Sequence, residues 1–420
     1  MRTEHDLRSA LRELERETPD TGKVLSQIAK RTSGKTAARG RRPSRRLLAG
    51  TAAAAGVIAI AVAAGLLVAP LRGRTALPNA SSVPRYYMAL APFNEKLFAK
   101  SGVFSYGYAV VKDRITGRTV ATVKSPRPYL GFVGVTGAAD DRTFVLTAQG
   151  SDSQPPEFFY ARFNPADRAV TLTPLALPGL PTTNDYFTAA LSPDGTKLAV
   201  AGINKIFTVA QIKVYSLPSG AAKTWSARAN SGLPFPSLNE LSWSQTGALD
   251  FDWVGTTAGS TAGVYLLNTN GAGGSLLTDG RKVFCPVPVQ LREPLTNGSY
   301  TGTDTAFLTP DGTTLISSVP QPIPVGQRPP ACGSRGLRAT MPELEEFSAS
   351  TGQATSVLYA SHSNNAVSDV YWSNASGSVL VVFAQTGSSF PSRGVFGILT
   401  ASTFTPIPGA SIQQLVDPAF

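Results

Sequence analysis

The sequence predicts an all-β fold, a β-propeller of about six four-stranded blades, preceded by one transmembrane helix and a short cytoplasmic tail. Three observations predict it. A run of 23 uncharged residues lies directly behind a cluster of arginines. Beyond Pro84 the chain consists of short apolar runs separated by Gly, Pro, Asn and Asp, a pattern typical of strands and turns. Two kinds of hairpin alternate along that part, and such repetition is typical of propeller blades.

The composition favours a globular chain with a sizeable core. Of the 420 residues, 42 % are apolar and 15 % are charged, against roughly 25 % charged residues in an ordinary soluble domain. This balance excludes a coiled coil, a collagen and a wholly disordered chain. The two Cys and two His are too few for a zinc-finger type of site, and we expect neither a metal nor a cofactor.

The net charge of +11 is concentrated at the start of the chain. Residues 1–46, the predicted cytoplasmic tail, hold 13 basic and 6 acidic residues. Leu7, Leu11 and Leu14 form one stripe of a short helix, which is marginal on its own in water. We expect a frayed tail. The alternative is a docking helix for a cytoplasmic partner.

Residues 47–69 are predicted to cross the lipid bilayer. As a helix these 23 residues are about 34 Å long, enough for a hydrocarbon core of about 30 Å. Arg41, Arg42, Arg45 and Arg46 flank the amino side, so the positive-inside rule puts the tail in the cytoplasm. Residues 70–84 are then a linker, and the rest of the chain is extracytoplasmic. A cleaved signal peptide is the alternative, although the polar lead is long for one.

The basic run before the span could also be read as a nucleic-acid patch. It has no interleaved aromatic residues and adjoins the span, so we expect contact with anionic lipid headgroups and no nucleic-acid partner. The order of tail, arginine cluster, span and exported domain resembles bacterial membrane-anchored anti-sigma regulators. The resemblance covers topology alone, because this tail has His5 but no Cys for the family's zinc-binding signature.

The first kind of hairpin carries a Pro-Asp-Gly-Thr turn. Leu191–Val200 matches Leu308–Ile316, and degenerate copies stand at 135–145, 241–249 and 370–380. In this turn Pro fixes φ, Asp accepts local backbone hydrogen bonds, and Gly takes a positive φ. The turn glycines at 195, 247, 312 and 377 are 52, 65 and 65 residues apart.

The second kind of hairpin is an apolar strand followed by small polar residues, often ending in Gly. Its six members lie at 111–117, 163–167, 214–220, 264–271, 347–352 and 398–402. Two hairpins make a four-stranded blade, and blades must stack around an axis because one blade cannot bury both of its faces. The sequence therefore predicts a propeller over residues 85–416, with six blades counted and seven left open.

The Ser-Pro-Asp-Gly-Thr-x-Leu motif at residues 192–198 resembles the inner-strand turn of WD-repeat-like and Tol-type bacterial propellers. The resemblance covers roughly residues 85–410 and implies an exported propeller on a bacterial, actinobacterial-like, single-pass membrane protein. Its motif is specific in two copies and permissive in the others.

Both cysteines, Cys285 and Cys332, lie in a Pro-rich interruption of the repeat. An exported, oxidising compartment favours a disulfide between them. In the chain-entropy model, closing a loop of about 48 residues contributes roughly 4 kcal/mol. Two free, buried thiols are the alternative.

No catalytic constellation is evident in the exported part, where His362 is the one histidine and stands in a polar loop. Asp250 and Asp252 alternate along a strand and so share a face. Directed into the central channel, they could bind a cation or act as an acid–base pair. We expect instead that they face solvent, with Phe251 and Trp253 in the core.

The remaining acidic residues have ordinary explanations in the sequence. Glu343, Glu345 and Glu346 are expected on a solvated strand edge, whereas Asp194 and Asp311 belong to turns.

The predicted function is that of a membrane-anchored, non-catalytic binding module for a protein, peptide or glycan, because loops on a rigid scaffold suit recognition. One alternative is a propeller hydrolase or lyase that uses channel carboxylates. Another is a regulator whose tail binds a cytoplasmic transcription factor. Inward-facing acids in the channel favour the enzyme, whereas an apolar or Ser/Asn-lined channel favours binding.

Overall fold

The computed structural model describes residues 83–90, 107–150, 156–180, 187–203, 208–228, 238–253, 263–285, 306–319, 322–329, 343–360, 365–374, 376–386, 393–411 and 416–420. The predicted tail, its arginines, the span and nearly all of the linker lie outside these residues, as do Cys332 and His362. In the described part of the chain, no helix is both long and apolar enough to cross a membrane.

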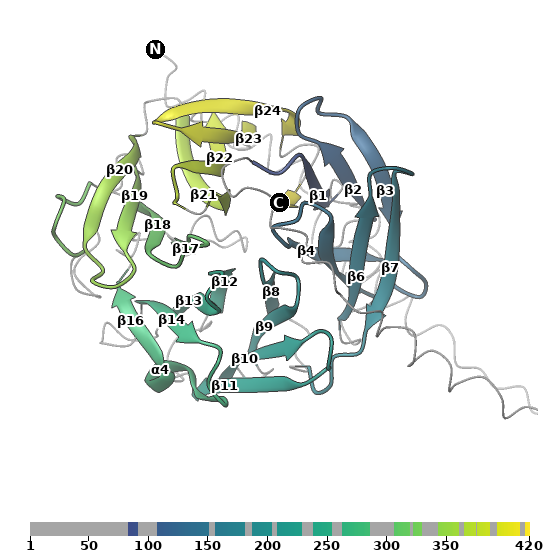
Figure 1. The fold of residues 1–420 in the computed structure, drawn as a ribbon, viewed down its shortest axis with the longest axis horizontal. Helices are drawn as coiled ribbons and strands as arrows, with labels where there is room; N and C mark the ends of the chain where they lie inside the picture. The colour runs from purple at the N-terminus through teal and green to yellow at the C-terminus, as the bar shows by residue number, and fades with distance from the viewer. Residues whose placement is uncertain are drawn as a thin grey trace, which may run out of the picture. The chain divides into compact units, whose positions relative to one another are not determined.

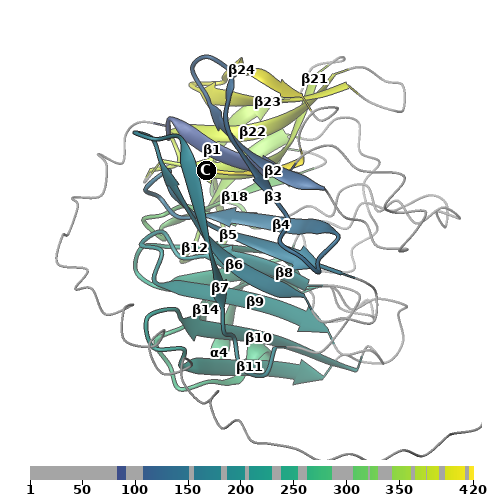
Figure 2. The same cartoon turned by 90° about the vertical axis from the view of Figure 1, so that its right-hand side faces the viewer.

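Six antiparallel sheets stand around a common centre (Figure 1). Each blade has four strands, and one of the six sheets carries a short fifth strand, which confirms the predicted all-β propeller and the count of six. Seen from the side, the sheets of neighbouring blades follow one another around the ring (Figure 2). We number the blades in chain order.

In blades 2 to 6 the chain runs from the innermost strand outwards. Blade 2 consists of β4 (Gly131–Gly137), β5 (Thr143–Gln149), β6 (Glu157–Asn164) and β7 (Ala169–Leu175). Blade 3 consists of β8 (Phe187–Leu191), β9 (Lys197–Ile203), β10 (Val209–Ser216) and β11 (Ala222–Arg228). Blade 4 consists of β12 (Leu238–Trp243), β13 (Ala248–Trp253), β14 (Gly263–Asn268) and β16 (Gly280–Phe284).

The last two blades follow the same order. Blade 5 consists of β17 (Ala306–Leu308), β18 (Thr314–Val319), β19 (Glu343–Ser348) and β20 (Ala354–Ala360). Blade 6 consists of β21 (Asn365–Ser373), β22 (Val379–Thr386), β23 (Arg393–Thr400) and β24 (Thr403–Ser411).

Blade 1 joins the two ends of the propeller. The chain enters through β1 (Tyr86–Leu90), β2 (Tyr108–Asp113) and β3 (Thr119–Lys124), and β25 (Val416–Ala419) returns to pair with β1 as the fourth strand. Met88 pairs with Ala419 and Leu90 with Val416 in this ladder. Strands from distant parts of the sequence therefore close the ring.

One small insertion links blades 3 and 4. Between β14 and β16, β15 (Gly274–Ser275) pairs in parallel with β11 and adds a fifth strand to the sheet of blade 3. The single turn of helix α4 (Leu276–Asp279) follows, and its N-cap Ser275 accepts a hydrogen bond from the backbone N–H of Thr278. A side-chain cap of this kind satisfies one of the free N–H groups at a helix start.

The two hairpin types occupy fixed places in the blades. The first joins the innermost strand to the second in blades 2 to 6, and the second joins the third strand to the outermost in all six. In the blade 3 turn, Asp194 Oδ1 accepts hydrogen bonds from Ser192 Oγ (2.6 Å) and Thr196 N (3.0 Å), while Gly195 has φ +68°. Asp311 makes the same contacts in blade 5, which confirms both aspartates as turn residues.

Apolar layers fill the spaces between the blades. The layer between blades 3 and 4 contains Trp225 from the former and Trp243, Phe251 and Trp253 from the latter, all buried. The expected core positions of Phe251 and Trp253 are thus confirmed. Both faces of a blade are covered in this way, which decides the environment of every residue on the middle strands.

Candidate functional site: the central cavity

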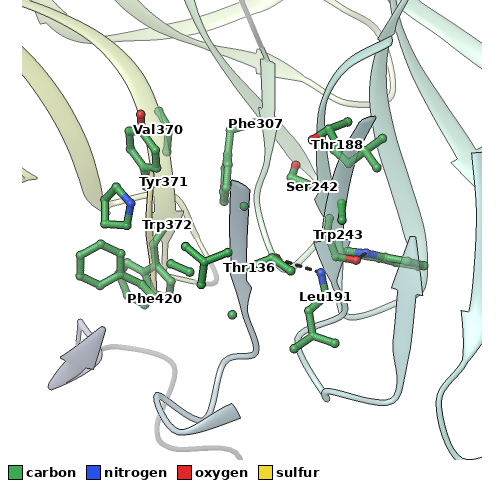
Figure 3. Close-up of a pocket in the computed structure, with 18 of the residues that line it drawn as sticks. Thr136, Thr188, Leu191, Ser242, Trp243, Phe307, Val370, Tyr371, Trp372 and Phe420 are labelled. Atoms are coloured by element: carbon green, nitrogen blue, oxygen red, sulfur yellow. Dashed lines mark hydrogen bonds between the residues drawn. The ribbon is translucent and has the colours of Figure 1, made fainter. Parts of the chain in front are cut away.

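The innermost strands of the six blades enclose a cavity of about 410 Å³. Its walls come from β4, β8, β12, β17, β21 and β25 with the residues around them, so every blade contributes (Figure 3). Ligand sites of a few hundred Å³ with apolar walls are typical of small molecules and of single side chains.

Aromatic side chains make up much of the wall. Phe307, Tyr371, Trp372, Trp243 and Phe420 all line the cavity, with Trp372 and Phe420 on the side opposite Trp243 (Figure 3). Phe420 also stacks on Tyr87, with ring centroids 4.8 Å apart. The wall therefore presents large, rigid aromatic rings to the cavity.

The polar part of the wall carries little charge. Within the described residues, Asp369 is the one charged side chain that lines the cavity, and no Lys, Arg or His does. The other polar side chains are mainly hydroxyls, among them Thr136, Thr188, Ser242 and Ser373. No feature of the sequence singled out Asp369, because its place depends on the register of β21.

Side-chain hydroxyls satisfy part of the exposed inner edge. An innermost strand has no neighbour on its channel side, so its N–H groups need other partners. Leu191 N donates to Thr136 Oγ1 of the preceding blade (3.0 Å), and Leu308 N donates to Ser242 Oγ (2.7 Å). Thr136 and Ser242 thus tie blade 2 to blade 3 and blade 4 to blade 5.

At equivalent points of the six blades, the residue that lines the cavity stands directly opposite a residue of the second strand in the β-ladder. In five blades this partner is apolar, and in blade 4 it is an aspartate. The pairs are Thr136 with Val145, Ala190 with Ala199, Ser242 with Asp250, Phe307 with Ile316, Trp372 with Val381, and Ala419 with Met88.

Asp250 is fully buried, and the expectation that it faces solvent is wrong. Its Oδ1 accepts a hydrogen bond from Ser242 N (2.8 Å) and another from Ser242 Oγ, while Oδ2 has no hydrogen-bond partner among the described residues. Burial raises the pKa of Asp250 to about 8, although the hydrogen bonds from Ser242 act in the opposite direction. A neutral carboxyl at pH 7 follows from this environment.

Asp252 is also buried, at 3 % exposure. It shares its face with Asp250, because the two pair with Val264 and Leu266, which belong to the apolar layer against blade 5. Neither aspartate lines the cavity itself. Asp250 is linked to the cavity through Ser242, and the described wall does not hold the paired carboxylates of the channel hypothesis.

The expectation that Glu345 lies on a solvated strand edge is also wrong. The residue is fully buried on β19, a middle strand, and its Oε1 accepts a hydrogen bond from Ile323 N (2.8 Å). Burial, and to a smaller extent Glu343, raises the pKa of Glu345 to about 7. Glu346 Oε2 accepts a hydrogen bond from Ser356 Oγ (2.5 Å). The expected strand edge is wrong because β19 pairs with β18 on one side and β20 on the other. The layer between blades 4 and 5 buries Glu345, whereas Glu343 and Glu346 are half-buried.

In the part of the chain that the structure describes, no group of three His, Cys, Asp or Glu could hold a metal ion. Cys285 is buried at the end of β16. Because Cys332 lies outside the described residues, the disulfide stays a prediction.

Neither a protein-family model nor a curated protein sequence matches the chain. Solved structures similar to it include the β-propeller domain of the Trilobed protease from Pyrococcus furiosus, at 12 % identity over 66 % of this chain and 71 % of that one, with a TM-score of 0.36. A periplasmic gluconolactonase from Pseudomonas aeruginosa is 14 % identical over 76 % of this chain and 81 % of its own, with a TM-score of 0.39. The six-bladed architecture described above rests on the strand pairing itself.

Proposed function

We propose that this protein is a non-catalytic binding module whose central cavity receives a short segment of a peptide. The observation that carries the proposal is the cavity wall, which combines large aromatic side chains with hydroxyls and one carboxylate. Pockets that pair aromatic faces with a small number of polar side chains are typical of sites that anchor one or two side chains of a ligand.

Size and chemistry favour a peptide over a folded protein or a glycan. A cavity of about 410 Å³ admits a chain end or a few side chains, but no folded domain. Sugars are recognised through many hydrogen bonds, whereas the described wall offers hydroxyls and one carboxylate and no amide or basic side chain. The free edges of the innermost strands supply backbone groups that an extended peptide can use.

The proposal of binding over catalysis rests on the same wall. A hydrolase or lyase that uses channel carboxylates requires two carboxyl groups that reach the substrate, and Asp369 is the one carboxyl group on the described wall. We further propose that the propeller is displayed outside the cell membrane on the predicted span 47–69. Digestion of the propeller by protease added to spheroplasts supports this placement, and protection until the membrane is lysed contradicts it.

The test of binding is panning of a random short-peptide display library on the purified full chain, followed by titration of the enriched peptides. Phe307 is half-buried in the cavity wall, so Phe307→Arg should weaken binding by at least about tenfold. Tyr108→Arg is the matched control, because Tyr108 is 43 % exposed and lies on β2, away from the innermost strands. Enriched peptides that bind Phe307→Arg as well as the wild type refute the site, and so does a library from which nothing is enriched.

A further inference from the structure

Blade 4 differs from the other blades behind the cavity wall. The tie between Ser242 and Leu308 N does not need an acid, because Thr136 makes the same tie to Leu191 N with Val145 as its partner. A buried carboxyl group with an oxygen that lacks a partner costs free energy. The folding of blade 4 therefore does not explain why residue 250 is an aspartate.

We propose that Ser242 and Asp250 together anchor a primary ammonium group of the ligand in the central cavity. The proposal rests on the proposed function and names the chemistry of the ligand. The ammonium group can come from the amino terminus of a peptide or from a lysine side chain.

The hydrogen bonds of Ser242 orient its hydroxyl for this role. Ser242 Oγ donates to Asp250 Oδ1 and accepts from Leu308 N, so its proton is directed away from the cavity. A hydroxyl has two lone pairs, and the second stays available to accept a hydrogen bond from an ammonium group. The carboxyl group behind Ser242 supplies the opposite charge.

The rest of the described wall suits a cation as well. Asp369 is a further acidic side chain on the wall, and no Lys, Arg or His lines the described part of it. The faces of Phe307, Tyr371 and Trp372 can attract a cation through their negative π-electron density. The one charged side chain on the described wall is thus acidic, although the net charge of the chain is +11.

The protonation state of Asp250 links binding to pH. At pH 6.5 a carboxyl group with a pKa of about 8 holds its proton, and a bound ammonium group favours the ionised form. Binding therefore transfers the proton of Asp250 to the buffer and leaves a carboxylate behind Ser242, opposite in charge to the bound cation. On the strand faces that meet in this layer, the described residues include four other charged groups, Asp252 on β13, Arg281 on β16, and Glu343 and Glu345 on β19. Lys282 and Glu346 lie on the opposite faces of the same strands. Arg281 donates to the carbonyl oxygens of Ala349 and Ser350.

The experiment is isothermal titration calorimetry of the full chain at pH 6.5 with three probes. Phenylalaninamide presents an α-ammonium group, Nα-acetyl-lysinamide presents a side-chain ammonium group, and N-acetyl-phenylalaninamide is neutral. Two buffers with different ionisation enthalpies report the number of protons released. We expect at least one ammonium probe to bind about tenfold more tightly than the neutral probe, with release of about one proton. The better of the two ammonium probes identifies the source of the group.

Two variants separate the anchor from the fold. Asp250→Asn should lower the affinity for the ammonium probe about tenfold and abolish proton release. Asp167→Asn is the matched control, because Asp167 is exposed in the turn between β6 and β7, and it should change neither quantity. Should Asp250→Asn not fold, the wild type alone decides. Its affinity for Nα-acetyl-lysinamide, which stays charged to about pH 10, should rise about tenfold from pH 6 to pH 7 and level off above pH 8. Its affinity for phenylalaninamide should rise in the same way up to about pH 7 and fall above about pH 8, where the α-ammonium group loses its own proton.

Three results distinguish failure of the anchor from failure of the proposed function. Ammonium probes that bind no better than the neutral probe overturn the anchor, and so does unchanged proton release in Asp250→Asn. The peptide site itself stands in both cases if Phe307→Arg still abolishes binding of the enriched peptides. Binding that is insensitive to Phe307→Arg overturns both.

Discussion

Removal of the buried acid in blade 4 should change how the stability of the propeller depends on pH. Asp250 is fully buried and has a pKa of about 8, against 3.8 for an ordinary aspartate. Between these two values the folded protein keeps a proton that the unfolded chain has lost. The free energy of unfolding therefore falls as the pH rises from about 4 to about 8, and it changes little above that range.

The size of the effect follows from the two pKa values. One pKa unit corresponds to about 1.4 kcal/mol, so the two units between pH 6 and pH 8 amount to roughly 3 kcal/mol. Asp250→Asn removes the titrating group while its side-chain oxygen can still accept the hydrogen bond from Ser242 N. The variant should therefore become more stable relative to the wild type by about 3 kcal/mol between pH 6 and pH 9.

Urea unfolding followed by tryptophan fluorescence at pH 6, 7, 8 and 9 measures this difference. Glu345 titrates in the same direction, with a pKa of about 7, but it is present in both proteins and cancels in the comparison. The exposed control Asp167→Asn should follow the wild type at every pH. Parallel pH profiles for the wild type and Asp250→Asn would refute the reasoning, because they would mean that Asp250 does not keep its proton in the folded protein.

Three further changes test other parts of the structure. Ser242→Ala leaves Leu308 N without its acceptor and removes the hydrogen bond from the hydroxyl to Asp250, so it should lower the free energy of unfolding in urea by about 2–4 kcal/mol. Thr136→Val removes only the bond to Leu191 N and should lower it by about 1–3 kcal/mol. Equal losses in the two variants would show that the bond to Asp250 contributes nothing to stability. Gly352→Ala should lower the stability by more than about 2 kcal/mol in thermal unfolding, because φ is +70° and the new Cβ would collide with the backbone oxygen of Val283. Reduction of the predicted Cys285–Cys332 disulfide should cost roughly 4 kcal/mol, and two alkylatable thiols in non-reducing mass mapping would contradict the bridge.

The hairpins predicted the blades because turn chemistry is local. A Pro-Asp-Gly turn needs only a few consecutive residues, and Asp194 and Asp311 make in the structure the contacts that such a turn requires. The sequence shows five turns of the first kind and six of the second. The missing turn belongs to blade 1, whose innermost strand β25 comes from the other end of the propeller. An unequal count of the two kinds is thus a signal of ring closure by a strand from the opposite end.

The buried acids could not be predicted because alternation along a strand does not say what covers each face. Asp250 and Asp252 share a face, as their spacing predicts, and so do Glu345 and Phe347. In a free sheet the polar face is the wet one. In a propeller the next blade covers it, so an acid on the second or third strand can be fully buried, as Asp250 and Glu345 are.

The wall residues stand at a fixed offset in sequence from the turns, and the strand register was needed to find this offset. The lining residue of blades 2 to 6 stands five positions before the turn residue with positive φ. These pairs are Thr136 and Asp141, Ala190 and Gly195, Ser242 and Gly247, Phe307 and Gly312, and Trp372 and Gly377. Since the turns can be found from sequence alone, this offset identifies five wall residues, and the strand partner of each then identifies the residue behind it. Applied here, the rule finds one acid among apolar partners, Asp250, so the position that departs from the repeat is the one on which the ligand experiments should concentrate.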